Sequence, residues 1–335
     1  MKVLHVYSTM KELVPRKGDL INEYGMNCAM SRFADVDFGM SNIGKSYDVA
    51  YIRANTEAFA RAKARVKVYV ASPYDGECFR KADALATLSR AWADDLHKGV
   101  ILAGMNPIGE VFGKAHSVGQ VVQNYFVPRW LSEKTLSIRE KYKGKFIIGY
   151  FGRVTKSNDQ TQFLNVFRKL MERYHGNVVF LAGITRSKEK SVKETGIVYT
   201  SYAHSDVPYA MSACDFVFVS DHSKSFDISG SMKTLEAAAC GVPVVLGRSR
   251  AREELLGKDY PYFVKWDHRF KRFSKFHTGD LFKKLCLVLD NSVLRAETGM
   301  KIMQNVKSYR VKAQSKKLKK WFSKLLKVKR HRKER

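Results

Sequence analysis

A single acid, a group of small residues and a valine-rich run come together between Gly230 and Val245, in the sequence GSMKTLEAAACGVPVV. Ser231 stands where it can cap a helix, Glu236 lies more than one turn further in, and Gly241 can end the helix in a left-handed conformation. Pro243 stops the helix, and the valines around it favour a buried strand. Open α/β sheets bind ligands where their strands end, so Glu236 is a candidate ligand-binding residue.

Strand-like and helix-like segments alternate along the chain in two series. In the first, the patterns predict strands over 2–8, 47–54, 66–73, 84–88 and 118–128. They predict helices over 20–33 and from 55 through 65, and a third helix that follows the strand 84–88 and ends at Gly99. In the second, they predict strands over 145–154, 177–183, 198–203, 214–221 and 263–266, helices over 160–174 and 206–213, and two terminal helices. The charged run 132–144 is predicted as a connector between the series. Such alternation implies a parallel, doubly wound sheet in each half.

Composition limits the classes of protein that fit. A length of 335 residues favours two domains, and an apolar content of 45% is ample for two cores. The five cysteines are scattered and have no histidine at ligand spacing, which indicates a reducing compartment and no metal site. The first residues run straight into a strand pattern without the apolar core of a signal peptide, and no stretch is apolar enough to span a membrane. We therefore expect a cytoplasmic protein.

The order of several landmarks resembles the GT-B glycosyltransferases, in particular the large retaining family 4. The stretch 230–245 is similar to the signature of that family, IGYFGRV (148–154) to the first strand of its donor domain, and YAMSACDFVFVSD (209–221) to a later one. KADALATLSRAW (81–92) and VVQNYFVP (121–128) resemble landmarks of its first domain. The similarity covers most of residues 1–300. It implies two tandem Rossmann-like domains that face a cleft: an acceptor-side domain (1–131), a linker (132–144), a nucleotide-sugar donor domain (145–300), and a C-terminal helix with a basic tail (301–335).

The resemblance also implies roles for individual donor-binding residues. Glu236 would grip the ribose hydroxyls of a sugar nucleotide, the alternative being a solvent-facing Glu in an ordinary turn. Arg153, which follows Gly152 at a strand end, would clamp the diphosphate, the alternative being a loop arginine paired with an acid. The backbone N–H groups of Gly230 and Ser231, near a helix N-terminus, are placed to hold the β-phosphate.

The chain departs from the family pattern at two positions. The family has a Lys five residues after Arg153, where this chain has Asn158; Lys156 is a substitute from a shifted loop or a solvated lysine. The family acid that touches the sugar is replaced by Ile228; the adjacent Asp227 either takes its place or braces the loop.

The first half of the chain offers weaker candidates for site residues. Gly18 is the one glycine in the turn after the first strand, where the family has several. His5 lies inside a predicted strand and is interpreted as a core residue.

A retaining transfer of this family needs no side-chain nucleophile, because the leaving phosphate takes the proton of the acceptor. We expect no required cofactor or metal, a UDP-sugar donor, and a GDP-sugar as the other possibility.

Charge is the second strong feature of the chain. Sixty Lys and Arg against 32 Asp and Glu give a net charge of +28. The segment 312–335 has twelve basic residues and one acid, and subtracting its +11 leaves +17 on the body. In this segment Leu318, Trp321, Phe322, Leu325 and Leu326 share one helical face. That pattern fits an in-plane membrane helix with its lysines on anionic lipid; packing of the stripe on the body, or nucleic-acid binding, are the alternatives. The candidate membrane-contact or polyanion-contact residues are Lys317, Lys320, Trp321, Phe322 and Lys324.

Three functions fit these observations. The first is a glycosyltransferase at the cytoplasmic membrane face that passes a sugar to a glycan or lipid-linked acceptor, as in cell-surface polysaccharide biosynthesis. The second is a virus-type transferase that modifies hydroxymethylated DNA bases, because such an enzyme also needs a basic surface. The third is a binding protein with a degraded donor site, which the residues Ile228 and Asn158 favour. The sequence does not indicate an oligomeric state.

Overall fold

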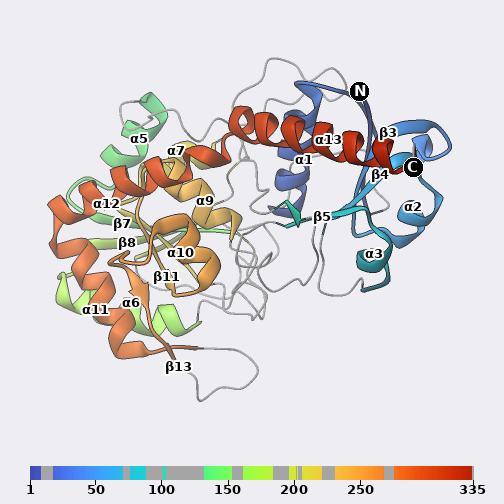
Figure 1. The fold of residues 1–335 in the computed structure, drawn as a ribbon. Helices are drawn as coiled ribbons and strands as arrows, with labels where there is room; N and C mark the ends of the chain where they lie inside the picture. Colours follow the sequence, from blue (N-terminus) through green and yellow to red (C-terminus); the bar gives the residue numbers. More distant parts are fainter. Residues whose placement is uncertain are drawn as a thin grey trace. The chain divides into compact units, whose positions relative to one another are not determined.

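A computed structural model describes residues 1–8, 18–70, 76–87, 101–102, 132–152, 161–183, 196–200, 202, 206–220, 231–267 and 275–333 (Figure 1). The chain divides into two compact units. Unit 1 comprises Met1–Val122 and Ser308–Arg335, and unit 2 comprises Gln123–Lys307. Each unit holds a parallel sheet with helices packed on it. The predicted α/β class with two sheets in tandem is confirmed.

Unit 1 is built on a sheet whose described strands have the order β2-β1-β3-β4-β5-β6, all parallel to their neighbours. Its strands are β1 (Lys2–Tyr7), β2 (Asp35–Phe38), β3 (Ser46–Arg53), β4 (Lys63–Val70), β5 (Ala84–Ala86) and β6 (Ile101–Leu102). Its helices are α1 (Gly18–Ser31), the 3-10 turn η1 (Met40–Asn42), α2 (Thr56–Arg61), α3 (Gly76–Lys81) and, from the other end of the chain, α13 (Val311–Lys333).

The two faces of this sheet are both buried. Val3 and Val49 point to one face, where they pack with Met26 and Met30 of α1. Their neighbours in sequence, such as Leu4, point to the other face. A strand buried on both sides needs a continuous apolar run, which explains why KVLHVY and DVAYIR lack the alternation of a half-exposed strand.

The C-terminal helix α13 completes the core of unit 1 and so corrects the membrane interpretation of its apolar face. Leu318 and Phe322 are fully buried in the cluster formed by α1 and the sheet, and Trp321 packs against that cluster. Figure 1 shows α13, in red, along α1, and the two helices are in contact. The ring of Phe322 lies 6.1 Å from that of Phe33. The prediction that Phe322 contacts the membrane is wrong, because this face already has an apolar partner within the protein.

Unit 2 repeats the parallel design, and its described strands have the order β12-β11-β10-β7-β8-β9. The strands are β7 (Phe146–Phe151), β8 (Val178–Gly183), β9 (Ile197–Thr200), β10 (Phe216–Val219), β11 (Val244–Gly247) and β12 (Phe263–Val264), and β13 (Trp266–Asp267) pairs with β14 (Lys275–Phe276) in a small antiparallel ribbon. The helices are α5 (Glu133–Lys141), α6 (Thr161–Arg173), α7 (Val207–Ser212), α9 (Met232–Ala239), α10 (Arg250–Leu256), α11 (Thr278–Asp290) and α12 (Ser292–Asn305), followed by the 3-10 turn η4 (Val306–Tyr309).

Aromatic packing fixes α6 on this sheet. Phe163 of α6 stacks on Phe218 of β10 with ring centroids 4.3 Å apart, and it lies 4.7 Å from the ring of Phe180 in β8. All three rings are buried. Because β10 and β8 flank β7, this contact places α6 across the central strand of unit 2.

Several boundaries differ from the sequence predictions for identifiable reasons. The predicted connector 132–144 contains helix α5, because Ser132 caps it and Arg139 pairs with Asp215 of unit 2 at 3.1 Å. The helix predicted through Arg65 ends at Arg61, because β4 begins at Lys63 and pairs with β3. Strand β2 and helix α10 were not predicted. The strand predicted over 118–128 and the helix up to 99 lie outside the described residues.

Candidate functional site

The chain order of unit 2 creates a switch point between β7 and β10. After β7 the chain moves to β8 and β9 on one side, and it then returns to β10 on the other side of β7. Open α/β sheets bind ligands at the carboxyl ends of the strands that flank such a switch point. Residues at these ends are the first place to look for a ligand site.

Gly152 stands at the carboxyl end of β7, and only glycine suits the position. Its φ is +132°, a value that L side chains rarely adopt. A Cβ atom placed there would also lie 3.2 Å from Cδ and 3.5 Å from Nζ of Lys233. The ammonium group of Lys233, from the first turn of α9, thus lies directly beside the backbone at the end of β7.

A second feature of this edge is a buried hydroxyl pair. Ser220, which follows β10, donates from Oγ to the phenol oxygen of Tyr150 in β7 at 3.4 Å. Both residues are almost completely buried. Lys233 lies 6.0 Å above the ring of Tyr150, a cation–π distance. Strands β7 and β10 and helix α9 therefore meet at one point, where polar atoms replace the apolar core.

Helix α9 brings the predicted acid to the same place. Ser231 occupies its N-cap position with extended backbone and is 3% exposed, but its side chain makes no capping hydrogen bond, contrary to the sequence prediction. Glu236 is 5% exposed and lies three residues after Lys233, which puts both on one face of the helix. Thr234 is fully buried, and its hydroxyl has no hydrogen-bond partner among the residues that the structure describes.

The first turn of α9 has the chemistry of an anion site. Its backbone N–H groups point away from the helix and are not bonded by the Ser231 hydroxyl. The helix dipole adds a partial positive charge at this end, and Lys233 adds a full one. Glu236 sits one turn behind them, where a carboxylate can accept hydrogen bonds from hydroxyl groups.

The structure places the other predicted residues as follows. Arg153, Lys156, Asp227 and Gly230 lie outside the described residues, so their roles stay predictions. Gly18 begins α1 in unit 1, which is not the unit that holds Gly152 and Glu236.

Lys233 is a candidate site residue that the sequence patterns do not single out. Its signal was present, since a lysine in the first turn of a helix that follows a glycine-serine pair is well placed for an anion. The sequence does not reveal the contact between Lys233 and Gly152, because the two residues are far apart along the chain and meet only when β7 and β10 pair in the sheet.

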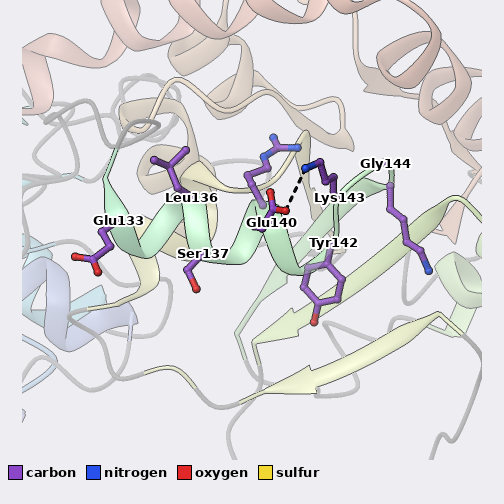
Figure 2. Close-up of a pocket in the computed structure, with 9 residues that line it drawn as sticks. Glu133, Leu136, Ser137, Glu140, Tyr142, Lys143 and Gly144 are labelled. Carbon is purple, nitrogen blue, oxygen red and sulfur yellow. Dashed lines mark hydrogen bonds and ion pairs between the residues drawn. The ribbon is translucent and has the colours of Figure 1, made fainter.

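The surface hollow drawn in Figure 2 belongs to a different part of unit 2. It has a volume of about 840 Å³ and runs along α5, where Glu140 and Lys143 pair at 3.2 Å and Leu136 is 47% exposed. Gly144 and Lys145, at one end of it, precede β7. The hollow thus lies at the amino end of β7, opposite the edge where Gly152 stands. We do not assign it to the ligand site.

No group of three or more His, Cys, Asp and Glu side chains in the described parts of the chain is placed to hold a metal ion. Among the same residues, no helix has both the length and the apolar character that crossing a bilayer requires.

Comparison with protein families gives the decisive observation for unit 2. Residues 145–267, which contain β7, α9, Gly152, Lys233 and Glu236, match the family described as glycosyl transferases group 1. Unit 2 carries a glycosyltransferase domain. No curated protein sequence matches the chain.

Solved structures extend the likeness to both units of the chain. HepE from Anabaena, solved in complex with UDP, aligns with a TM-score of 0.68 and 14% identity over 97% of this chain and 100% of its own. A glycosyltransferase from Rickettsia africae aligns with a TM-score of 0.68 and 13% identity over 97% and 98%. A UDP-forming α,α-trehalose-phosphate synthase from Burkholderia xenovorans aligns with a TM-score of 0.63 and 12% identity over 96% and 100%. At these identities the comparisons establish the GT-B fold.

Proposed function

We propose that this glycosyltransferase moves a sugar from a UDP-sugar to a glycan or lipid-linked acceptor. The observation that carries the proposal is the meeting of Glu236, Lys233 and the start of α9 with the carboxyl ends of β7 and β10. Helix α9 carries a carboxylate, Glu236, that can accept hydrogen bonds from ribose hydroxyls, and a cation, Lys233, that can face a diphosphate. HepE structures containing UDP or UDP-glucose support a uridine nucleotide; a GDP-sugar is the other donor to test.

The proposed mechanism uses positioning and charge. Glu236 accepts hydrogen bonds from the ribose, and the first turn of α9 with Lys233 and Arg153 faces the diphosphate. As the bond between the anomeric carbon and the β-phosphate oxygen breaks, these cations stabilise the growing negative charge on UDP. The acceptor oxygen bonds to the anomeric carbon on the same face, and its proton passes to the departing phosphate. We propose that the configuration is retained, with Asp227 and Lys156 near the sugar and phosphate.

The test is turnover with a panel of UDP-, GDP- and CMP-sugars. The protein is incubated with each donor, and release of the free nucleotide is followed with and without added acceptor glycans. Nucleotide release from a UDP-sugar supports the proposal. Absence of binding and release for every nucleotide sugar contradicts it and favours the binding-protein alternative that Ile228 and Asn158 suggested.

Arg153 gives a direct prediction for turnover. Replacing Arg153 with Ala should lower kcat at least about tenfold, because one charge-assisted contact to the leaving diphosphate is lost. The thermal midpoint should stay nearly unchanged. Steady-state kinetics with a UDP-sugar and a melting curve measure both, and full activity would exclude a phosphate role.

The basic face of α13 suggests where the enzyme works. We define it by the exposed residues Lys312, Lys316, Lys319, Lys320, Lys327 and Arg330, which form one stripe along the helix opposite its buried face. Helix α13 contains no acidic residue, and Lys317 and Lys324 add exposed charge beside the stripe. We propose that this face binds the anionic lipid of the cytoplasmic membrane surface, with no insertion of Trp321 or Phe322. The acceptor would then be membrane-borne.

A charge-reversal variant tests the membrane proposal without damaging the fold. Deleting 312–335 would remove Leu318 and Phe322 from the core, so we choose the triple change K316E/K320E/K327E instead. Each surface lysine is worth about 1 kcal/mol on anionic lipid, so binding to vesicles with 30% phosphatidylglycerol should weaken about 100-fold or more.

The matched control is K283E/K301E/K307E, which changes the same net charge at exposed lysines of unit 2. Equal vesicle binding by the two triple variants would contradict a specific role for α13. Loss of duplex-DNA binding, measured at several salt concentrations, with vesicle binding intact would favour the DNA-modifying alternative.

A further inference from the structure

Unit 1 has a switch point of its own, between β1 and β3. The chain passes from β1 to β2 on one side and from there to β3 on the other side of β1. Residues after β1 and β3 therefore border a second crevice position, at the carboxyl edge of the first sheet.

The backbone at this edge is held in an unusual conformation on both strands. Ser8 follows β1 with a φ of +51°, and Ala54 follows β3 with a φ of +53°. The two turns are tied together, since Ser8 N donates to the Arg53 carbonyl at 3.0 Å and Asn55 Nδ2 donates to the Ser8 carbonyl at 2.6 Å. Positive φ in residues other than glycine is costly and concentrates at ligand sites.

A buried network fixes one arginine at the same edge. Arg53 Nη1 donates to Glu23 Oε1 at 2.6 Å, and the other carboxylate oxygen of Glu23 contacts His5 Nε2 at 2.9 Å. Asn27 Nδ2 donates to His5 Nδ1 at 3.2 Å, so the ring N–H at Nε2 is the donor to Glu23. Glu23 and His5 are fully buried, whereas the Arg53 side chain is 13% exposed.

The charged side chains of this network fix the orientation of Arg53. Burial favours the neutral form of Glu23, yet Arg53 and His5 beside it hold its pKa below the usual value. Glu23 is therefore a carboxylate in the core. Buried ion pairs add little net stability, because desolvation offsets the attraction between the charges. The structural effect of the network is to hold the Arg53 guanidinium in place at the carboxyl edge of the first sheet.

We propose that Arg53 binds an anionic group, phosphate or carboxylate, on the acceptor. The planar guanidinium matches the paired oxygens of both groups. Glu23 and His5 are positioning residues that set its orientation. That the anion belongs to an acceptor rests on the proposed glycosyl transfer, whereas the anion site itself rests on unit 1 alone.

Binding measurements on sugars that differ only in charge test this site. The full chain, saturated with UDP so that the donor site is filled, is titrated with glucose 6-phosphate, with glucuronate and with glucose by calorimetry. We expect at least one anionic sugar to bind about tenfold or more tightly than glucose, and Arg53→Gln to remove this preference. The phosphate and carboxylate arms identify which group is recognised. His5, labelled with ¹⁵N on the ring, should shift during the titration, because it touches Glu23.

The control is Arg65→Gln, an exposed arginine on β4 that pairs with Asp48 at 3.3 Å. It should keep the preference. If Arg53→Gln does not fold, Arg53→Lys keeps the charge beside Glu23 but loses the planar fork, and a reduction of the preference of about fivefold is expected. No preference in the original chain, or the same preference in the Arg53 variant, would overturn the proposal.

The outcome separates this site from the donor site. Binding of the anionic sugar does not require turnover, so it is measured even if no nucleotide sugar reacts. Conversely, loss of the preference in Arg53→Gln with unchanged hydrolysis of UDP-sugar in the absence of acceptor places the defect on the acceptor side.

Discussion

Replacing Glu236 with Gln should weaken UDP binding about 100-fold, because a carboxylate accepts hydrogen bonds from hydroxyl groups far more strongly than an amide does. Glu236 is 5% exposed on α9, so a hydrogen bond to it forms in a largely water-free setting, where electrostatic interactions are least screened. Isothermal calorimetry with UDP measures the effect directly. Gln preserves the shape of the side chain and the packing of α9.

A comparison of two nucleotides separates the ribose contact from a general loss of structure. The original chain should bind UDP much more tightly than 2′-deoxy-UDP, because Glu236 would lose one of its hydroxyl partners. Glu236→Gln should reduce this difference. Glu172→Gln, an exposed acid on α6, is the matched control and should leave the difference intact. Equal discrimination in all three proteins would rule out Glu236 as the ribose ligand.

Sequence reasoning was most successful where local chemistry alone determines structure. The string from Gly230 to Val245 predicted a helix and a strand, and the structure has α9 and β11 there. Gly241 takes a φ of +74° just after the helix, as its position predicted. Small residues, a left-handed glycine and a proline act within a few residues of one another, so their effect can be read without the rest of the fold.

The failures concern contacts between distant segments. Phe322 and Leu318 gave the pattern of an amphipathic helix, but the pattern is the same whether the apolar face meets lipid or protein. Only the fold shows that α1 and the first sheet provide the partner. Arg53 and Glu23 were likewise invisible as a pair, because β3 and α1 come together only through the sheet.

Lys233 leads to the second prediction with a large effect. Replacing it with Met should lower kcat with a UDP-sugar about 100-fold, the scale on which one preorganised electrostatic group stabilises a transition state. Met keeps an apolar stem beside Gly152 and over Tyr150, so α9 should stay in place. UDP binding should weaken less than kcat falls, because the charge on the diphosphate grows as the sugar leaves. Steady-state kinetics and calorimetry give the two numbers.

The control for Lys233 is Lys145→Met, an exposed lysine at the amino end of the same strand β7. Equal kcat in the two variants would contradict a role for Lys233 in the reaction. The double variant Lys233→Met/Arg153→Ala then tests whether the two cations act on the same diphosphate. If both face the same diphosphate, their effects should fall short of additive or exceed it by a measurable coupling, whereas independent residues give simple addition. Such coupling would indicate that Lys233 takes over the role of the lysine that the family has where this chain has Asn158. The chain could then lack that lysine and still catalyse transfer.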